Sequence, residues 1–246
     1  MSRVAWQRRP EVLPVTGRET LTRKAAETAE PSILTRWPVL RDIAGRIGIP
    51  ELKRRLTHMS PGLLPFLLWI IPHQDPWGPF LMNSVVGISI ALTAVILYRF
   101  HMMARSQRET GLSAVIGYVI PVVSSLVLLP GRAEIGMMTL AIIAVGDGSA
   151  TLGGLWFGGT KLPWNSRKTF TGLMCFCLCG TLLGTLVYWG EARPEVSWTM
   201  ALLCAAGATL AAAVVESLPL PTNDNFRVGM TAALTAACIQ FYGFGG

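Results

Sequence analysis

The sequence predicts an all-α fold, a polytopic transmembrane helical bundle of about seven spans with a basic cytosolic N-terminal segment. Of its 246 residues, 51% are hydrophobic and 14% are charged, whereas a soluble domain carries about a quarter charged residues. The charges are also uneven, because residues 1–58 hold 12 of the 21 Lys and Arg residues. No basic helix with interleaved aromatic residues and no zinc-finger spacing accompanies this charge, so nucleic acid is not an expected partner.

The N-terminal part is expected to lie outside the bilayer. Residues 1–31 mix Arg, Glu, Thr and Pro without periodicity and are expected to form a flexible basic cytosolic tail. From Ile33 to Ile47 apolar residues recur at helical spacing, while Arg and Asp side chains fill much of the other face. This pattern is typical of an amphipathic helix in the membrane interface, predicted over 32–50. Packing against the cytosolic end of the bundle is the alternative. The transmembrane domain is expected over 51–246.

Seven apolar segments follow this helix. They lie at 59–73, 77–99, 111–129, 134–157, 170–189, 196–215 and 227–245. A spanning helix needs about 20 residues, so most of them qualify. The first is short and contains Pro61, Pro65 and Pro72, which leaves open whether it crosses fully.

The basic residues indicate the orientation. If the first segment crosses, 19 of the 21 Lys and Arg residues are cytosolic, and only Arg132 and Arg193 lie outside. The positive-inside rule favours this arrangement. We therefore expect a multi-pass integral membrane protein with a cytosolic N-terminus, located in a bacterial inner membrane.

Small residues indicate close helix packing. Gly154-x-x-x-Gly158 and Gly180-x-x-x-Gly184 permit close approach of helix backbones, within the chain or in a homodimer. The five cysteines all lie inside apolar stretches, where cysteine usually acts as a small apolar residue.

Three polar clusters interrupt the apolar pattern. Ionisable residues in apolar segments are costly and mark functional sites by default. The first cluster is Lys53–His58, which could equally be a basic anchor for lipid headgroups. The second begins at Gly146-Asp147-Gly148 and continues to Lys161, Asn165, Arg167 and Lys168. The alternative to a functional site at this second cluster is a structural role, with Asp147 neutral or paired within the bundle.

The third cluster follows the sixth apolar segment. It contains Glu216 and Asn223-Asp224-Asn225, for which a simple turn with Asx capping is the alternative. Carboxylate oxygens suit Mg²⁺, which combines a few carboxylates with substrate phosphates. Lys and Arg suit the charge on a transferring phosphoryl group. Together the clusters predict a phosphate-handling site at the cytosolic interface.

At these clusters the sequence resembles the phytol kinase and dolichol kinase family of membrane lipid-alcohol kinases. The matching motifs are Arg54-Arg55-Leu56-Thr57-His58, Gly146-Asp147-Gly148, Leu162–Thr169 followed by Gly172, and Val215–Pro219 followed by Asn223-Asp224-Asn225. The likeness covers about 50–235 with motif order and spacing intact. In two places the sequence departs from the family pattern, since Asn223 replaces an acidic residue and Thr169 replaces a serine.

The resemblance implies a kinase that transfers the γ-phosphoryl group of CTP to the hydroxyl of an isoprenoid or other lipid alcohol, such as phytol, a polyprenol or dolichol. The implied Mg²⁺ ligands are Asp147 and Asp224, with Glu216 as a third acid. Lys168 and Arg167 would neutralise charge on the γ-phosphate, and His58 and Arg55 would touch phosphate or orient the alcohol. The other residues expected at the nucleotide are Gly146, Gly148, Lys161, Asn165, Thr169 and Asn225.

Two other functions stay open at this point. One is a CTP:phosphatidate cytidylyltransferase-like nucleotidyltransferase, although the closing signature of that family is missing from the sequence. The other is a membrane transporter in which Asp147 and Glu216 serve as intramembrane proton or cation sites. No inverted repeat is visible, and the cations cluster between the apolar segments instead of within them.

Overall fold

The computed structural model describes residues 37–70, 73, 77–88, 91, 94 and 111–244, without the side chains of 39 and 111–116. The chain divides into two compact units, 1–45 and 46–246, each of which is described by itself. The predicted tail over 1–31 lies outside the described residues.

The N-terminal amphipathic pattern forms a helix where it is described. Helix α2 spans Pro38–Ile47, and Gly48 follows it with a φ of 86°. Glycine adopts this left-handed backbone without steric cost, so the chain can turn there. A second helix, α3 (Ile49–Met59), then begins with Pro50 in its first turn. The interfacial location of α2 stays a prediction.

The first predicted apolar segment is broken where its prolines lie. Met59 is followed by a 3₁₀ turn over Ser60–Leu63 and by the short helix α4 (Leu64–Leu68). Pro61 and Pro65 each stand in the first turn of these elements, where a missing N–H costs nothing. A further short helix spans Pro79–Ile88.

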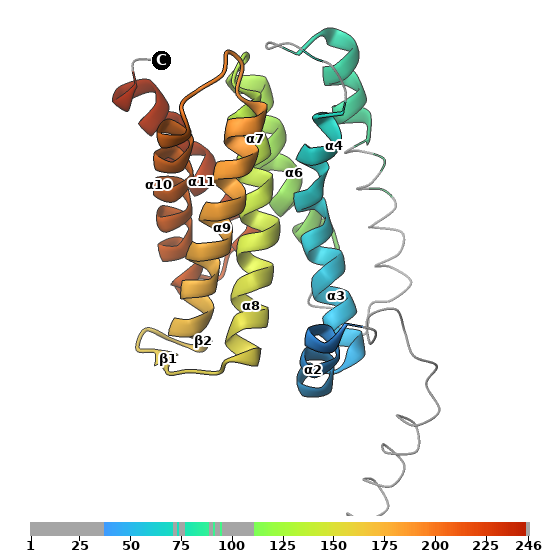
Figure 1. Ribbon diagram of the computed structural model, residues 1–246, viewed down its shortest axis with the longest axis vertical. Coiled ribbons are helices and arrows are strands. Elements are labelled where there is room, and N and C mark those ends of the chain that lie inside the picture. Colours follow the sequence, from blue (N-terminus) through green and yellow to red (C-terminus); the bar gives the residue numbers. More distant parts are fainter. Residues whose placement is uncertain are drawn as a thin grey trace, which may run out of the picture. The chain divides into compact units, whose positions relative to one another are not determined.

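The remaining elements form the body of the second unit. Figure 1 shows helices that run up and down alongside one another, with a small hairpin at one end. The helices are α6 (Gly111–Leu128), α7 (Ala133–Ala141), α8 (Asp147–Trp156), α9 (Phe170–Glu191), α10 (Trp198–Ser217) and α11 (Asp224–Cys238). A π-helical turn over Ile142–Gly146 joins α7 to α8, and another over Ile239–Gly243 follows α11.

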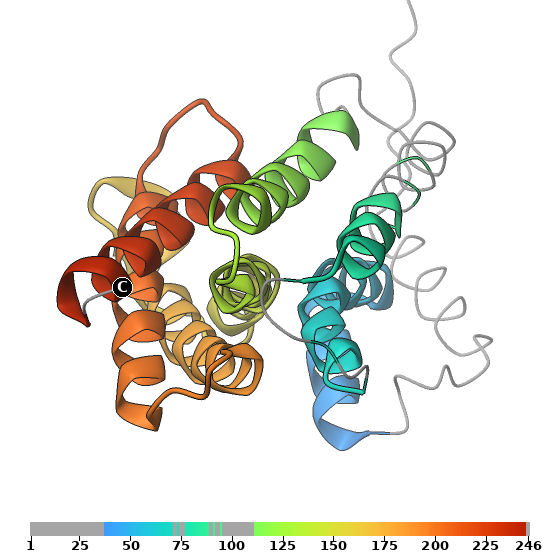
Figure 2. The ribbon, with the colours of Figure 1, turned by 90° about the horizontal axis from the view of Figure 1, so that it is seen from above.

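Helix α7 lies at the centre of this arrangement. All nine of its residues are buried, and it contacts α6, α9 and α11 (Figure 2). The core around it is built from Ile, Met, Phe and many alanines of α10 and α11. Small side chains let these helices approach closely.

Glycines confirm one of the two predicted packing motifs. A Cβ added to Gly180 would lie 2.8 Å from Thr209 Cγ2, and one added to Gly184 would lie 3.4 Å from Ala205 Cβ. These two glycines therefore bring α9 against α10. The prediction for Gly158 was wrong, because it lies beyond the end of α8 in a turn with a φ of 68° and no neighbour within 4 Å.

The all-α prediction is confirmed except for one element. Strands β1 (Lys161–Leu162) and β2 (Asn165–Thr169) form an antiparallel hairpin between α8 and α9. Sequence reasoning missed this hairpin because its residues are polar and the strands are short.

The predicted number of spans is not confirmed. Among the described residues, three helices are long and apolar enough to cross a membrane, and they are Ala133–Trp156, Phe170–Glu191 and Trp198–Ser217. The apolar helices over 79–88 and 117–128 are shorter. Part of the predicted segment 77–99 lies outside the described residues.

Candidate active site

The polar side chains gather where the hairpin meets the end of α10. Asn165 Nδ2 donates to the carbonyl oxygen of Ser217 at 3.0 Å, and Trp164 Nε1 donates to the hydroxyl of Ser217 at 3.1 Å. Asn165 Oδ1 in turn accepts from the backbone N–H of Arg167 at 3.1 Å. The hairpin is therefore fixed to the C-terminal turn of α10, which positions Lys168 on β2.

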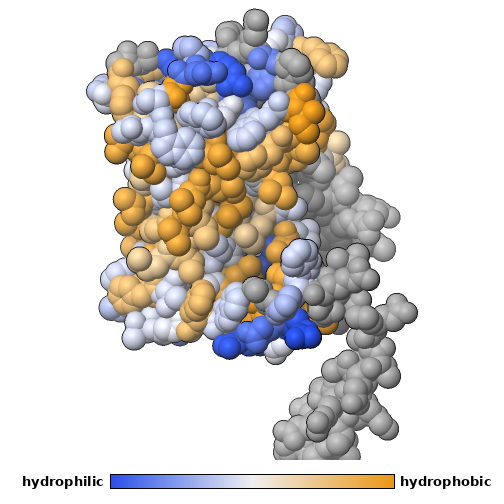
Figure 3. Space-filling view, viewed as in Figure 1, coloured by the Kyte–Doolittle hydropathy of each residue, from blue (hydrophilic) through white to orange (hydrophobic). Residues whose placement is uncertain are grey.

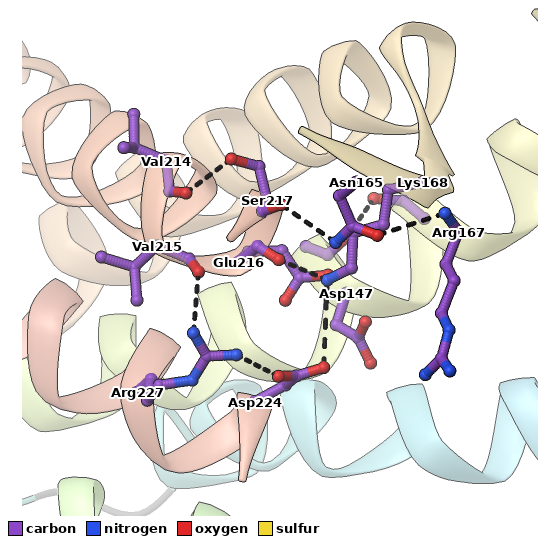
Figure 4. Close-up of polar contacts among 12 residues, drawn as sticks. Asp147, Asn165, Arg167, Lys168, Val214, Val215, Glu216, Ser217, Asp224 and Arg227 are labelled. Atoms are coloured by element: carbon purple, nitrogen blue, oxygen red, sulfur yellow. Dashed lines mark hydrogen bonds and ion pairs between the residues drawn. The ribbon is translucent and has the colours of Figure 1, made fainter. Parts of the chain in front are cut away.

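Lys168 joins two of the predicted acidic residues. Its ammonium nitrogen lies 2.5 Å from Glu216 Oε1 and 3.9 Å from Asp224 Oδ2, and it also donates to the backbone carbonyl of Glu216. Figure 4 shows these side chains and Asp147 converging from four different elements. The second and third clusters, which are far apart in the sequence, thus meet at one place.

Asp224 is held from its other side by an arginine of its own helix. Arg227 donates to Asp224 Oδ1 and, through Nη1, to the carbonyl of Val215 at 3.2 Å. Half of the Asp224 side chain remains exposed, whereas Arg227 is largely buried. Arg227 therefore positions the acid while the carboxylate still faces solvent (Figure 4).

Asp147 belongs to a second polar group beside the first. His58 Nε2, in the last turn of α3, lies 2.9 Å from Asp147 Oδ2 and 2.9 Å from the hydroxyl of Tyr118. Tyr118 also donates to the carbonyl of His58 at 3.2 Å. Asp147 begins α8 directly after the π-helical turn, and such turns are frequent at functional sites.

Electrostatics links the two groups. Asp147 lies within electrostatic range of Lys168 and Arg55, and Glu216 within range of Asp147 and Asp224. Arg55 itself pairs with Glu51 at 3.0 Å. The Arg54 guanidinium, hydrogen-bonded to the same carboxylate, holds the pKa of Glu51 below its ordinary value. The carboxylates of the site therefore have cations on two sides, Lys168 on β2 and Arg55 on α3.

Several residues predicted at the nucleotide have local structural partners. Thr169 caps α9 by accepting from Gly172 N at 3.1 Å. Gly146 and Gly148 lie in helical backbone, where a Cβ would meet Phe176 and Met59 respectively. Packing thus accounts for both glycines, and their role in phosphate binding stays a prediction.

Two further predicted residues lie at the margin. The side chain of Lys161 is exposed on β1 and does not line the pocket described below. Asn225 lies where α11 meets α6, because a Cβ on Gly117 would be 2.7 Å from Asn225 Cβ. The neighbouring Asn223 caps α11 by accepting from Phe226 N at 3.0 Å, as the Asx alternative anticipated.

An open pocket of about 490 Å³ lies between the hairpin and the loop that joins α10 to α11. Its polar lining comes from β2 and the start of α11, and its apolar lining from the loop. The lining residues are Trp164, Asn165, Ser166, Arg167, Lys168, Leu218, Pro219, Leu220, Pro221 and Asp224. This volume is large enough for part of a substrate with a charged end.

The carboxylate oxygens of the site can be compared with the ligands that the implied Mg²⁺ ion needs. In the described part of the chain, no three His, Cys, Asp or Glu side chains are close enough to hold a metal ion together. Magnesium is usually bound through one or two carboxylates plus substrate phosphates, however. Asp147 and Asp224 supply such oxygens, and the buried Glu216 Oε2 has no hydrogen-bond partner among the described groups. The residues therefore fit a magnesium–phosphate complex.

Sequence reasoning missed three residues that organise the site. Tyr118 holds His58, Ser217 holds the hairpin, and Arg227 holds Asp224. Ser217 lies within a motif that resembles the kinase family, so its position was visible although its role was not. Tyr118 stands alone in an apolar segment, where a hydroxyl needs a partner when buried.

The fold and the site thus define a helical protein with three described helices long and apolar enough to cross a membrane, and with a cation- and carboxylate-lined pocket at one end. Phytol kinase 1, chloroplastic, from Arabidopsis thaliana is 29% identical over 204 residues, which cover 78% of this chain and 67% of the relative. Farnesol kinase, chloroplastic, from the same plant is 28% identical over 208 residues, covering 77% and 66%. Probable phytol kinase 3, chloroplastic, from Glycine max is 27% identical over 202 residues, covering 77% and 63%.

The chain is therefore a homologue of phytol and farnesol kinases, and it spans about two thirds of the length of these curated relatives. The resemblance read from the motifs is confirmed. No family model and no solved structure matches the chain. The relatives are chloroplastic plant proteins, so the expectation of a bacterial inner membrane finds no support.

Proposed function

We propose that the protein is a kinase that transfers the terminal phosphoryl group of a nucleoside triphosphate to the hydroxyl of an isoprenoid alcohol. The observation that carries this proposal is the convergence of Lys168, Glu216 and Asp224 beside Asp147. The names of the relatives, phytol kinase and farnesol kinase, supply the acceptor class.

The reaction breaks the bond between the γ-phosphorus and its bridging oxygen and forms a bond to the alcohol oxygen, whose proton is released. Such transfers depend mostly on positioning and electrostatic stabilisation. Lys168 and Arg167 supply positive charge beside the pocket, and Arg55 supplies it from α3. Asn165 keeps β2 in place through Ser217, which fixes the position of Lys168.

Magnesium, held by Asp147 and Asp224 with Glu216 as a third acid, would neutralise phosphate charge. Asp147 Oδ2 lies 2.9 Å from His58 Nε2, so Oδ1 is the oxygen that would hold the metal. Release of Lys168 from Glu216 when phosphate binds would free a second carboxylate. His58, a quarter exposed, is the side chain that orients the alcohol beside Asp147.

The donor and the membrane orientation are also part of the proposal. CTP is the donor implied by the resemblance to phytol and dolichol kinases. The basic residues beside the pocket favour the cytosolic face by the positive-inside rule. Exposed apolar side chains on the spanning helices would let the alcohol reach the pocket from the bilayer.

A labelling experiment separates this proposal from the other functions. Purified protein in detergent with magnesium is given a C15 or C20 isoprenoid alcohol and CTP labelled at either the γ- or the α-phosphate. A kinase transfers the γ-label to lipid and leaves the α-label on the nucleotide. A cytidylyltransferase would transfer the α-label, and a transporter would transfer neither.

A further inference from the structure

The two acids proposed to hold magnesium share one feature, because a nitrogen of another residue holds one oxygen of each. His58 Nε2 lies 2.9 Å from Asp147 Oδ2. Arg227 Nη2 donates to Asp224 Oδ1 (Figure 4). A carboxylate with one oxygen already held can offer a cation only its other oxygen, unless that contact is broken. Each acid is therefore arranged to bind a cation through a single oxygen.

The contact at Asp224 is the more firmly fixed of the two. Arg227 also donates through Nη1 to the carbonyl of Val215 at 3.2 Å, so its guanidinium joins α11 to the end of α10. The Arg227 side chain is 10% exposed, whereas the Asp224 side chain is 51% exposed. Separation of this pair would leave a nearly buried charge without its carboxylate, which is strongly unfavourable. Arg227 is therefore expected to keep Oδ1 when a ligand enters the pocket.

The other oxygen of Asp224 has a weaker partner. Lys168 Nζ lies 3.9 Å from Oδ2, which is longer than a hydrogen bond. The same nitrogen lies 2.5 Å from Glu216 Oε1. An ammonium group at the longer distance is displaced more easily than the guanidinium at Oδ1. Oδ2 is thus the oxygen that Asp224 presents to a cation in the pocket.

Coordination through single oxygens suits magnesium better than calcium. Ca²⁺ takes about six to eight oxygens and readily binds both oxygens of one carboxylate. Mg²⁺ is smaller and requires a nearly regular octahedron, in which the two oxygens of one carboxylate are too close together to occupy neighbouring positions. A carboxylate that can offer only one oxygen therefore disfavours calcium and keeps the geometry that magnesium needs.

Charge alone does not select between these ions, because the site is open to water. Asp224 is half exposed, and the hairpin beside it lies at one end of the bundle (Figure 1). Figure 3 shows polar side chains at either end of one face of the molecule and apolar side chains across its middle. Hydrated divalent cations can therefore reach the acids, whose charge attracts all of them alike. Discrimination must come from the geometry of the ligands.

We propose that Arg227 is a positioning residue that makes the site selective for magnesium over calcium. By holding Oδ1 of Asp224, it limits this acid to one oxygen, and His58 does the same at Asp147. This role differs from charge neutralisation, since a cation beside an acid would by itself weaken the binding of both ions. The selectivity rests on the proposed kinase function, because the metal is bound together with the phosphates of the nucleotide.

Displacement of manganese measures the selectivity without turnover. Purified protein in detergent is given Mn²⁺ and a non-hydrolysable CTP analogue, and electron paramagnetic resonance follows the release of Mn²⁺ as Mg²⁺ or Ca²⁺ is added. The ratio of the two displacing concentrations is the readout. In the wild type this ratio should favour Mg²⁺ about tenfold more than in the free analogue. A wild-type ratio equal to that of the free analogue would overturn the proposal, and this comparison needs no variant.

Arg227→Met removes the group that holds Oδ1 of Asp224. We expect the ratio to shift about tenfold towards Ca²⁺, which is the usual size of the effect when a partner of a metal ligand is removed. Loss of the positive charge strengthens the binding of both ions alike, so it does not change the ratio. Arg227→Lys keeps a cation beside Asp224 and should return the ratio towards the wild-type value, even where the protein melts at a lower temperature.

The matched control is Arg193→Met. Arg193 also donates to carbonyls at the end of a helix, those of Gly190 and Ala192, and it does not line the pocket. Its ratio should equal that of the wild type. An unchanged ratio in Arg227→Met, or equal shifts in Arg227→Met and Arg227→Lys, would overturn the proposal and leave Arg227 a structural residue. Absence of γ-label transfer by the wild type would instead contradict the kinase function itself.

Discussion

Two polar clusters stand at opposite ends of the same bundle, and they differ in exposure. The site cluster consists of His58, Asp147, Lys168, Glu216 and Asp224, and the distal cluster consists of His73, Glu134, Glu191 and Gln240. In the distal cluster His73 Nε2 lies 3.0 Å from Glu191 Oε1, and Gln240 Nε2 donates to Glu134 Oε1 at 2.9 Å. Both clusters therefore consist of paired groups contributed by different elements.

The difference lies in access to solvent. The exposed fractions of the Asp224 and Lys168 side chains are 51% and 27%, whereas those of Glu134 and Glu191 are 1% and 0%. A buried pair with no route to solvent can only join helices, while a pair at a pocket can exchange its partner for a substrate. Titratable residues inside apolar segments therefore indicate function when their cluster opens to a pocket, as that of Glu216, itself only 6% exposed, does through Lys168 and Asp224.

The largest effect is expected for Asp147→Asn. The amide can still accept from His58 Nε2, so the fold should survive, but the negative charge beside the phosphates is lost. We expect transfer of γ-label from CTP to a lipid alcohol to fall about 10²- to 10³-fold or more. Thermal unfolding of the detergent-solubilised protein is the control, and near-normal activity would remove Asp147 from the proposed machinery.

The second largest effect on activity is expected for Lys168→Met. Methionine keeps the length of the side chain and removes the charge that lies between Glu216 and Asp224. We expect the KM for CTP to rise or kcat to fall by about 10- to 100-fold, since a charge-assisted contact is lost. Normal kinetics combined with a lower melting temperature would make Lys168 a structural residue like those of the distal cluster.

The opposite pattern is expected for Glu191→Ala in the distal cluster. Removal of this fully buried carboxylate deprives His73 of one partner and should cost about 1–3 kcal/mol of stability. The KM values of the protein that remains folded should not change. Glu195→Ala, an exposed glutamate four residues later, serves as the control and should unfold like the wild type. If Glu191→Ala lost activity without losing stability, the distal cluster would have a role in the reaction and its contrast with the site cluster would be wrong.

The smallest effect is expected for Ser217→Ala. This change removes the partner of Trp164 Nε1 but keeps the carbonyl that binds Asn165. A loss of about 0.5–1.5 kcal/mol in one hydrogen bond should raise the KM for the substrate that binds beside Trp164 a few-fold. Ser124→Ala is a matched control, because Ser124 also donates to the carbonyl three residues earlier. If Ser124→Ala raised the KM as much as Ser217→Ala, the hydrogen bond between Ser217 and Trp164 would have no specific role in the pocket.

Much of the site was predictable because its signals are local. Asp147 interrupts an apolar segment, Thr169 precedes an apolar helix as a cap residue, and Asn223 does the same for α11. The family resemblance added the order of the motifs. The distal cluster was not predicted, because Glu134 and Glu191 lie at the ends of apolar segments, where charged residues are ordinary.

The partners of these residues were not predictable. The sequence does not show that Tyr118 reaches His58 across 60 positions or that Trp164 and Asn165 both reach Ser217. The contacts to Ser217 depend on how closely α9 approaches α10 and α8, which Gly180 and Gly172 permit by lacking a side chain. Glycine spacing indicates that close approach is possible and leaves open which helix approaches.

The sequence alone determined the helical and strongly apolar character of the chain and the chemical types of its site residues. Hydropathy and motif order are properties of consecutive residues, so no packing is needed to read them. Only the tertiary structure decided which acids face an open pocket and which are sealed at the far end. Access depends on neighbours from other helices, and the loop 218–221 with the hairpin leaves Asp224 exposed while the bundle closes over Glu134 and Glu191.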